Sequence, residues 1–248
     1  MPEGPSIVLA KEDIRHLTGL TVKTAKSTAT RIDAERFSGT TLKSVRSWGK
    51  HLLLKFDNIT LRIHFLMFGS YAIGKPKAGR VAKLAIHFSG GDSLFIYAAA
   101  MTIIEGPINK TYDWSADVMS MHWNPGNALS KLKANRERLI CDALLDQQIF
   151  SGVGNIIKNE VLFRTRIHPL NKVGNIPARR MKALVDDAKD YSFLFLKWKR
   201  KFVLKKHWEA YTKKKCPRDG HPLTKLYAGT TQRRTFFCEQ CQELFTGP

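Results

Sequence analysis

Four side chains near the end of the chain are of types that bind metal ions, namely Cys216, His221, Cys238 and Cys241. Zinc favours four nitrogen or sulfur ligands in a tetrahedron, and a short tail without a core of its own needs such a staple. A Cys-x-x-Cys pair also occurs in redox sites, and the Cys216-x4-His221 spacing is looser than in a usual zinc knuckle. We expect these four residues to hold one structural zinc ion.

Two arginines, Arg233 and Arg234, lie between these ligand pairs in a polar stretch with β-prone flanks. At the tip of a hairpin braced by metal, such side chains could enter a DNA groove. The residues alone allow the alternative that the arginines only keep the tail soluble. The remaining cysteine, Cys141, stands between apolar residues, so we interpret it as a buried structural thiol.

The whole chain carries a large positive charge. It has 248 residues, with 41 Lys and Arg against 21 Asp and Glu, so its formal net charge is +20. Such an excess indicates a polyanionic partner, most simply a nucleic acid, although charge alone also fits a ribosome-like or membrane-surface protein. No apolar run approaches the ~18 residues of a membrane span, and the start of the chain does not resemble a secretion signal. We therefore expect a soluble, intracellular protein located in the cytoplasm or nucleoid.

The positive charge is concentrated in the second half of the chain. Residues 126–248 hold 25 basic and 11 acidic side chains, against 16 and 10 in residues 1–125. The densest segment, 197–215, has nine Lys or Arg and one acid, Glu209. This segment is either a solvated helix end or a stripe that faces phosphates.

The elements that must position these residues differ between the two halves. A helix is predicted over 6–17, followed by strands at 51–56, 59–66, 84–88, 94–97 and 102–104. Turn residues at 124–126 mark a boundary, after which apolar residues recur with helical spacing as far as Tyr211. The prediction is a two-domain α+β protein: an N-terminal helix and β-sandwich (1–125), a helical domain (126–212) and a zinc-binding β-hairpin module (213–248).

Four sequence motifs together resemble one enzyme family. They are Met1-Pro2-Glu3-Gly4-Pro5, Gly49-Lys50-His51-Leu52-Leu53-Leu54, the stretch 144–155 that ends in Gly152-Val153-Gly154-Asn155 and is followed by Glu160 and Phe163, and the tail. The order and spacing are similar to those of the formamidopyrimidine-DNA glycosylase and endonuclease VIII family, over the whole chain. That family's zinc ribbon reads C-x2-C-x16-C-x2-C, and sixteen residues separate His221 from Cys238. The resemblance implies a helix-two-turn-helix element in the second domain.

The resemblance implies a bifunctional DNA glycosylase and AP lyase of base excision repair, with Pro2 as the nucleophile once Met1 is removed. An α-amino group titrates near ~7.7–8.0 and a lysine near ~10.4, so the former has the larger neutral fraction at pH 7. A proline amine that attacks the sugar C1′ forms a permanently charged iminium, an electron sink for elimination of the phosphates. Glu3 is then the carboxyl that exchanges protons, besides being a favourable acid at a helix start. On its own, Lys50 would be interpreted as a solvated residue at the end of a strand. The resemblance implies instead that it contacts a phosphate beside the lesion.

Further residues are implied to bind DNA. In the turn Gly152-Val153-Gly154-Asn155, glycines such as Gly154 let the backbone approach a phosphate and Asn155 adds a side-chain donor. Arg233 contacts the lesion phosphate from the hairpin, with Arg234 beside it. A flipped nucleotide leaves a void in the duplex, which side chains must fill. Leu66, Met67 and Phe68 stand where the family carries the side chains that fill this void. The alternative interpretation is that they are the end of a strand packed in the core.

The branch of the family is indicated by a loop that this sequence lacks. The purine-specific branch usually carries an Asp-Pro-Arg-Arg-Phe-Gly loop, whereas residues 97–106 here lack its arginines and phenylalanine. The chain therefore looks more like endonuclease VIII, which implies oxidised pyrimidines as substrates and β,δ-elimination. We expect a monomer that acts on damaged double-stranded DNA, with single-stranded or bubble DNA as further substrate forms, and with no membrane partner.

Two alternatives come from other classes of protein. A catalytically silent DNA-binding relative would keep the charge and the zinc module, but would not need the Pro2-Glu3 pair. An RNA-binding zinc-ribbon protein of ribosomal type would explain the charge but not the N-terminal motif.

Overall fold

The computed structural model describes residues 2–246. The chain divides into two units, and the division falls between Tyr112 and Asp113. This division falls earlier than the boundary expected after residue 125. The segment from Asp113 belongs to the second unit because its side chains bind the next helix: Lys131 donates to Asp113 (2.8 Å), and Asn127 donates to Ser115 (2.7 Å). The segment expected to bind zinc, from residue 213 onward, falls within the second unit.

The first unit is an antiparallel sheet with one helix. Helix α1 (Gly4–Ile14) buries Ile7, Ala10 and Ile14, the spacing of a single apolar face. The sheet has the strand order β1-β5-β6-β4-β3-β2. Its strands are β1 (Val22–Ser27), β2 (Ser44–Trp48), β3 (His51–Lys55), β4 (Ile59–Ile73), β5 (Leu84–Phe88) and β6 (Ser93–Glu105). Helix α1 packs against β2 and β3.

The predicted β-sandwich is a single continuous sheet whose two halves share one core. The first part of β4 pairs with β3, and the first part of β6 pairs with β5, while β4 and β6 pair along both parts. Leu54 from one half and Ile86 from the other lie in the same apolar cluster as Ile7 of α1. The predicted strands 94–97 and 102–104 are one strand, because β6 continues past Ala98 without leaving the sheet.

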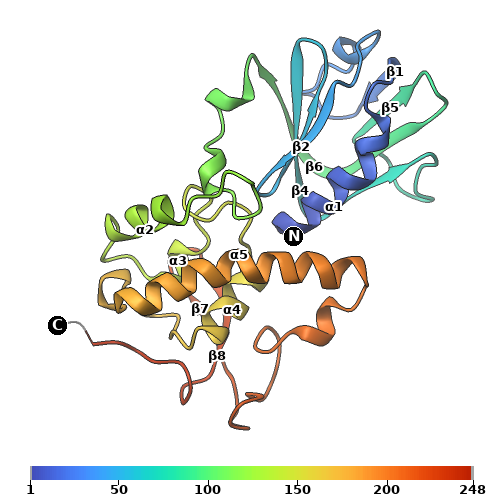
Figure 1. Ribbon diagram of the computed structural model, residues 1–248. Coiled ribbons are helices and arrows are strands. Elements are labelled where there is room, and N and C mark those ends of the chain that lie inside the picture. Colours follow the sequence, from blue (N-terminus) through green and yellow to red (C-terminus); the bar gives the residue numbers. More distant parts are fainter. Residues whose placement is uncertain (1, 247–248) are drawn as a thin grey trace. The chain divides into compact units, whose positions relative to one another are not determined.

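The second unit is mainly helical, as predicted. It contains α2 (Pro125–Lys133), the short α3 (Ile140–Ala143), α4 (Asn155–Arg164) and the long α5 (Ala178–Arg200), then the hairpin of β7 (Thr224–Ala228) and β8 (Arg233–Phe237). Helix α5 buries Leu184, Val185 and Ala188 and packs on α2 and α4 (Figure 1). Strand β8 packs against α4, so the hairpin is mounted on that helix. Within residues 2–246, no helix combines the length and hydropathy that crossing a membrane requires.

Candidate functional site

Pro2 and Glu3 lie directly before α1. Glu3 has an extended backbone (φ −105°, ψ 170°), and its carbonyl accepts a hydrogen bond from the Ser6 amide (2.8 Å), which makes it the residue that starts the helix. Pro5 is tolerated in the first turn because amides there have no partner within the helix. Glu3 is only 5% exposed, so it is largely shielded from solvent. The expected removal of Met1 concerns a residue outside the described part of the chain.

Lys50 lies in the tight turn between β2 and β3. Trp48 pairs with His51, so Gly49 and Lys50 form a two-residue hairpin loop. Gly49 has φ +50°, in the left-handed region, as a type II′ turn requires of its first central residue. This turn aligns with the right-handed twist of the strands, and Lys50 is fixed at the end of a hairpin against which α1 packs.

Two histidines beside Lys50 had been given no role by sequence analysis. His51 and His64 are paired across β3 and β4, with ring centroids 5.4 Å apart, and the Tyr112 hydroxyl lies 3.3 Å from His51 Nδ1. Burial, followed by the charges of His64, Arg62 and Lys50, lowers the pKa of His51 to about 4. Burial also lowers the pKa of His64, against an opposing hydrogen bond to the Lys50 backbone. Near neutral pH both rings are therefore mainly uncharged. The one signal in the sequence that could have revealed the pair is that His51 and His64 stand opposite each other when the two strands of the predicted hairpin are aligned.

Leu66, Met67 and Phe68 project from a bulge in β4. Phe65 pairs with Ala99 and Ser70 with Tyr97, so the four residues between Phe65 and Ser70 face one residue of β6. The three side chains are 43%, 65% and 78% exposed, which excludes their alternative interpretation as core residues. Gly69 is required there because a Cβ atom on it would lie 2.7 Å from the Ala98 carbonyl oxygen.

In the second unit, Gly154 and Asn155 form the start of α4. Gly154 is the extended residue before the helix, so the positive end of the helix dipole lies at this turn. The Asn155 side chain donates to the Arg234 carbonyl (2.9 Å), which brings two of the predicted DNA-binding residues together. The same bond means that the amide of Asn155 supports the hairpin, in addition to any contact with a phosphate.

Helix α4 holds the hairpin through buried groups that sequence analysis had not identified. Asn159 is fully buried, accepts a hydrogen bond from the Phe236 amide (2.7 Å) and donates to the Arg234 carbonyl (3.3 Å). Lys158, also buried, donates to Thr235 Oγ1 (2.8 Å). These contacts join residues more than seventy positions apart, so no local pattern could have predicted them.

Arg233 and Arg234 begin β8 and are exposed. The pair Ala228 and Arg233 closes the hairpin loop, so Arg233 lies beside the tip as predicted. The loop is fastened to buried Asp142, whose carboxylate accepts from the Thr230 amide (2.9 Å). The hairpin is therefore held along its strand by α4 and at its tip by Asp142.

Three of the four predicted metal ligands in the tail lie close together, and Asp219 takes the place of the fourth, His221. Cys216, Asp219, Cys238 and Cys241 have ligand atoms that all lie within 4.8 Å of one another. Cys216 Sγ and Cys241 Sγ are 3.8 Å apart, too far for a disulfide and equal to the edge of a tetrahedron with Zn–S bonds of ~2.3 Å. Three thiols and a carboxylate are donors that zinc accepts, so these residues fit a zinc ion. The fourth predicted ligand, His221, lies outside the group with its side chain 59% exposed.

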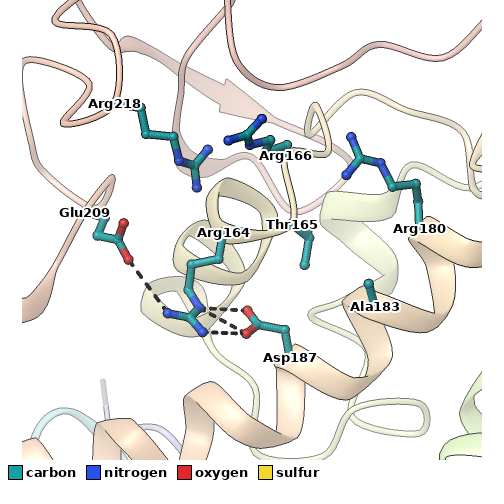
Figure 2. A pocket seen from close by; sticks show the side chains of 8 residues that line it. All are labelled: Arg164, Thr165, Arg166, Arg180, Ala183, Asp187, Glu209 and Arg218. Carbon is teal, nitrogen blue, oxygen red and sulfur yellow. Dashed lines mark hydrogen bonds and ion pairs between the residues drawn. The ribbon is translucent and has the colours of Figure 1, made fainter.

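An arginine-lined pocket of about 550 Å³ lies at the other end of α4 (Figure 2). Arg164 binds the Asp187 carboxylate of α5 through Nε and Nη2 (3.0 and 2.8 Å) and lies 3.8 Å from Glu209. The Arg218 guanidinium stacks on the Phe163 ring, donates from Nη2 to the Phe163 carbonyl (2.8 Å) and donates from Nη1 to Cys241 Sγ (3.4 Å). We interpret Arg164 and Arg218 as structural, since they tie the end of α4 to α5 and to the cysteine cluster.

Comparisons with known proteins match both units to domains of the same enzyme family. Residues 1–99 match the formamidopyrimidine-DNA glycosylase N-terminal domain, and residues 116–192 match the formamidopyrimidine-DNA glycosylase H2TH domain. Endonuclease 8-like 3 of Mus musculus is 33% identical over 84% of this chain and 35% of its own length. Endonuclease 8-like 2 of Bos taurus is 36% identical over 73% of this chain and 58% of its own length. The chain thus spans about a third to somewhat over half of these relatives.

Solved structures agree on the fold. Lactococcus lactis formamidopyrimidine-DNA glycosylase, bound non-covalently to DNA with an AP site, superimposes with a TM-score of 0.86 at 22% identity, covering 97% of this chain and 99% of that one. The N-terminal and H2TH domain matches follow one another in the family's order, and the curated relatives are of the endonuclease 8-like kind. The chain therefore belongs to the formamidopyrimidine-DNA glycosylase and endonuclease VIII family, within its endonuclease VIII-like branch.

Proposed function

We propose that the protein is a DNA glycosylase with AP lyase activity that acts in base excision repair. The observation that carries the proposal is the start of α1, where Pro2 precedes a buried, helix-initiating Glu3 within the family's N-terminal domain. Removal of Met1 would make Pro2 the terminal amine, next in sequence to this buried acid, which supports the proposal. The names of the endonuclease 8-like relatives support the same assignment.

The proposed chemistry uses one covalent intermediate. After removal of Met1, the Pro2 nitrogen forms a bond to the sugar C1′ as the bond from C1′ to the base breaks, and the sugar ring opens to give an iminium. Glu3 exchanges protons with the opening ring and the leaving groups. Loss of a C2′ proton sends the electron pair of the C–H bond into the iminium and gives an enamine, which returns the pair to the iminium system as the 3′ phosphate leaves with the C3′–O electrons. Loss of the C4′ proton then expels the 5′ phosphate in a second elimination. Lys50 binds a phosphate beside the lesion and assists these departures.

DNA is proposed to be held by both units. The turn that contains Gly154 and Asn155 and the exposed Arg233 and Arg234 supply donors and positive charge for phosphates around the lesion. Leu66, Met67 and Phe68 are exposed on a bulge, as side chains that fill the void of a flipped nucleotide must be. One zinc ion at the cysteine cluster stabilises the hairpin that carries the arginines.

Oxidised pyrimidines are the proposed substrates. Residues 97–106 lack the arginines and phenylalanine of the purine-specific loop, and most of them continue strand β6 instead of forming a loop. We propose double-stranded DNA as the main partner of a monomeric enzyme, with single-stranded or bubble DNA also accepted, and β,δ-elimination as the way in which the strand is cut.

Borohydride trapping tests this proposal, because it reduces the iminium to a stable adduct. Duplexes with thymine glycol, dihydrouracil, 8-oxoguanine or an abasic site are incubated with protein whose terminus is confirmed as Pro2 by sequencing. We expect adducts with the abasic site and both pyrimidine lesions, and little with 8-oxoguanine. The matched control carries one extra residue before Pro2 and should bind DNA without being trapped. Absence of any adduct from the Pro2 protein would indicate a silent DNA-binding relative, and preference for structured RNA an RNA-binding protein.

A further inference from the structure

The first half of the cysteine cluster has an unexpected composition. Its side chains come from two short segments, Cys216-Pro217-Arg218-Asp219 and Cys238-Glu239-Gln240-Cys241, which share the same two-residue spacing. We propose that Asp219, and not His221, is the fourth ligand of the zinc ion, so that the site is of Cys3Asp type. This inference rests on the proposed zinc ion and not on the proposed enzymatic activity.

The two segments form the same turn. The Gly220 amide donates to the Cys216 carbonyl (2.9 Å), and the Gln242 amide donates to the Cys238 carbonyl (3.1 Å), so each turn closes between its first residue and the residue after its last. Asp219 therefore occupies in the first turn the position that Cys241 occupies in the second. His221 lies beyond the turn, at the position equivalent to Glu243.

The side-chain positions agree with this equivalence. Asp219 Oδ2 is 3.1 Å from Cys238 Sγ, and the Asp219 side chain is 24% exposed, against 59% for His221. After Gly220, whose φ of +75° is in the left-handed region, the His221 carbonyl accepts from the Cys216 amide (2.8 Å). The chain at His221 has thus already turned back to pair with Cys216.

His221 has a different relation to the site. Its Nδ1 lies 3.4 Å from Asp219 Oδ1, the oxygen that also accepts the His221 amide (3.0 Å), while Oδ2 faces the cysteines. Residues that hydrogen-bond a metal ligand orient it, and their loss typically weakens metal binding about 10–100-fold. His221 is accordingly a positioning residue for Asp219.

Cobalt substitution of the full chain separates the two assignments, because thiolate-to-cobalt charge-transfer absorption scales with the number of sulfur ligands. Asp219→Cys should add a fourth thiolate and raise that absorption per bound metal by about one third, with tighter binding in a chelator competition. The matched variant His221→Cys should leave the absorption unchanged. Asp219→Ala should weaken metal binding more than His221→Ala does.

Each other outcome has a distinct meaning. A fourth thiolate in His221→Cys but not in Asp219→Cys, or loss of metal in His221→Ala with retention in Asp219→Ala, would overturn the assignment of Asp219. If Asp219→Ala does not fold, the Asp219→Cys spectrum alone decides. If the unaltered chain takes up no zinc or cobalt, this inference and the zinc proposal both fail, whereas trapping on Pro2 is decided independently.

Discussion

His51 shows how a half-buried side chain next to Lys50 in sequence links stability to pH. Its ring is paired with His64, lies next to Tyr112 and is close to the positive charges of Arg62 and Lys50, all of which favour the neutral form or leave it undisturbed. Near pH 7 the uncharged rings add no positive charge beside Lys50, the residue proposed to bind a phosphate. The cost appears only in acid, where the ring must be protonated against its surroundings.

We predict that His51→Gln reduces the acid sensitivity of folding. Between pH 6.5 and about 4 the unfolded chain protonates residue 51 while the folded chain does not, so stability falls as pH falls through this window. The native protein should lose about 1–3 kcal/mol more than His51→Gln over that range, the lower values applying if solvent screens the ring. Urea denaturation at several pH values measures this loss, with the exposed His16→Gln as control. Parallel losses in all three proteins would contradict the assignment.

Single residues differ in how far the sequence could reveal them. The roles of Pro2, Lys50 and Arg233 were predicted from the resemblance of their motifs to the family, and the structure places these residues at a helix start, in a hairpin turn and beside a hairpin tip. Asp219 could have been found, since it repeats the two-residue spacing of the second turn. Asn159 could not, because its role depends on contact with Phe236 on a distant strand.

At the scale of elements, regular periodicity was predictable and interruptions of it were not. The apolar series of α5 and the hairpin of β3 and β4 are confirmed. Strand β1 was missed because its sequence, Val-Lys-Thr-Ala-Lys-Ser, has one buried residue and no clear alternation. The length of β4 was underestimated because its bulge at 66–69 exposes apolar side chains in the middle of a strand.

Helix α4 is the element that decides where the hairpin arginines lie, so weakening its grip should affect DNA binding. Asn159→Ala removes the acceptor of the buried Phe236 amide and one donor to the Arg234 carbonyl. We predict a loss of stability of about 1–3 kcal/mol, because a buried amide is left without a partner, and weaker binding to a duplex with an abasic-site analogue. Thermal denaturation and fluorescence anisotropy measure the two effects.

Asn127→Ala is the matched control for this prediction. Asn127 also makes a side-chain hydrogen bond within the second unit, to Ser115, and among residues 2–246 its described hydrogen bonds do not reach the hairpin. It should change stability without a comparable change in DNA affinity at temperatures where both variants are folded. Equal effects of the two variants on affinity would show that α4 does not position the arginines.

For the molecule as a whole, we divide the charge of +20 into a few residues that are proposed to contact specific phosphates and many that attract DNA non-specifically. The residues proposed to hold phosphates at the lesion, Lys50, Asn155 and Arg233, are few and are fixed by turns and buried contacts. Most of the Lys and Arg side chains of segment 197–215 are instead exposed, at the end of α5 and in the irregular chain that follows it. Exposed lysines without fixed geometry suit sequence-blind attraction to DNA, which is released by salt.

We predict that replacing Lys205, Lys206 and Lys213 by Gln makes DNA binding less sensitive to salt while leaving chemistry intact. Each lost phosphate contact lowers the slope of log affinity against log salt by about 0.9, so the triple variant should lose about two to three units. Single-turnover trapping at saturating protein should be unchanged, since Pro2, Glu3 and Lys50 are untouched. The control is Gln at the exposed Lys23, Lys26 and Lys75 of the first unit. An equal drop in slope there would assign the attraction to net charge, and a collapse of trapping in the first variant would place segment 197–215 in the catalytic machinery.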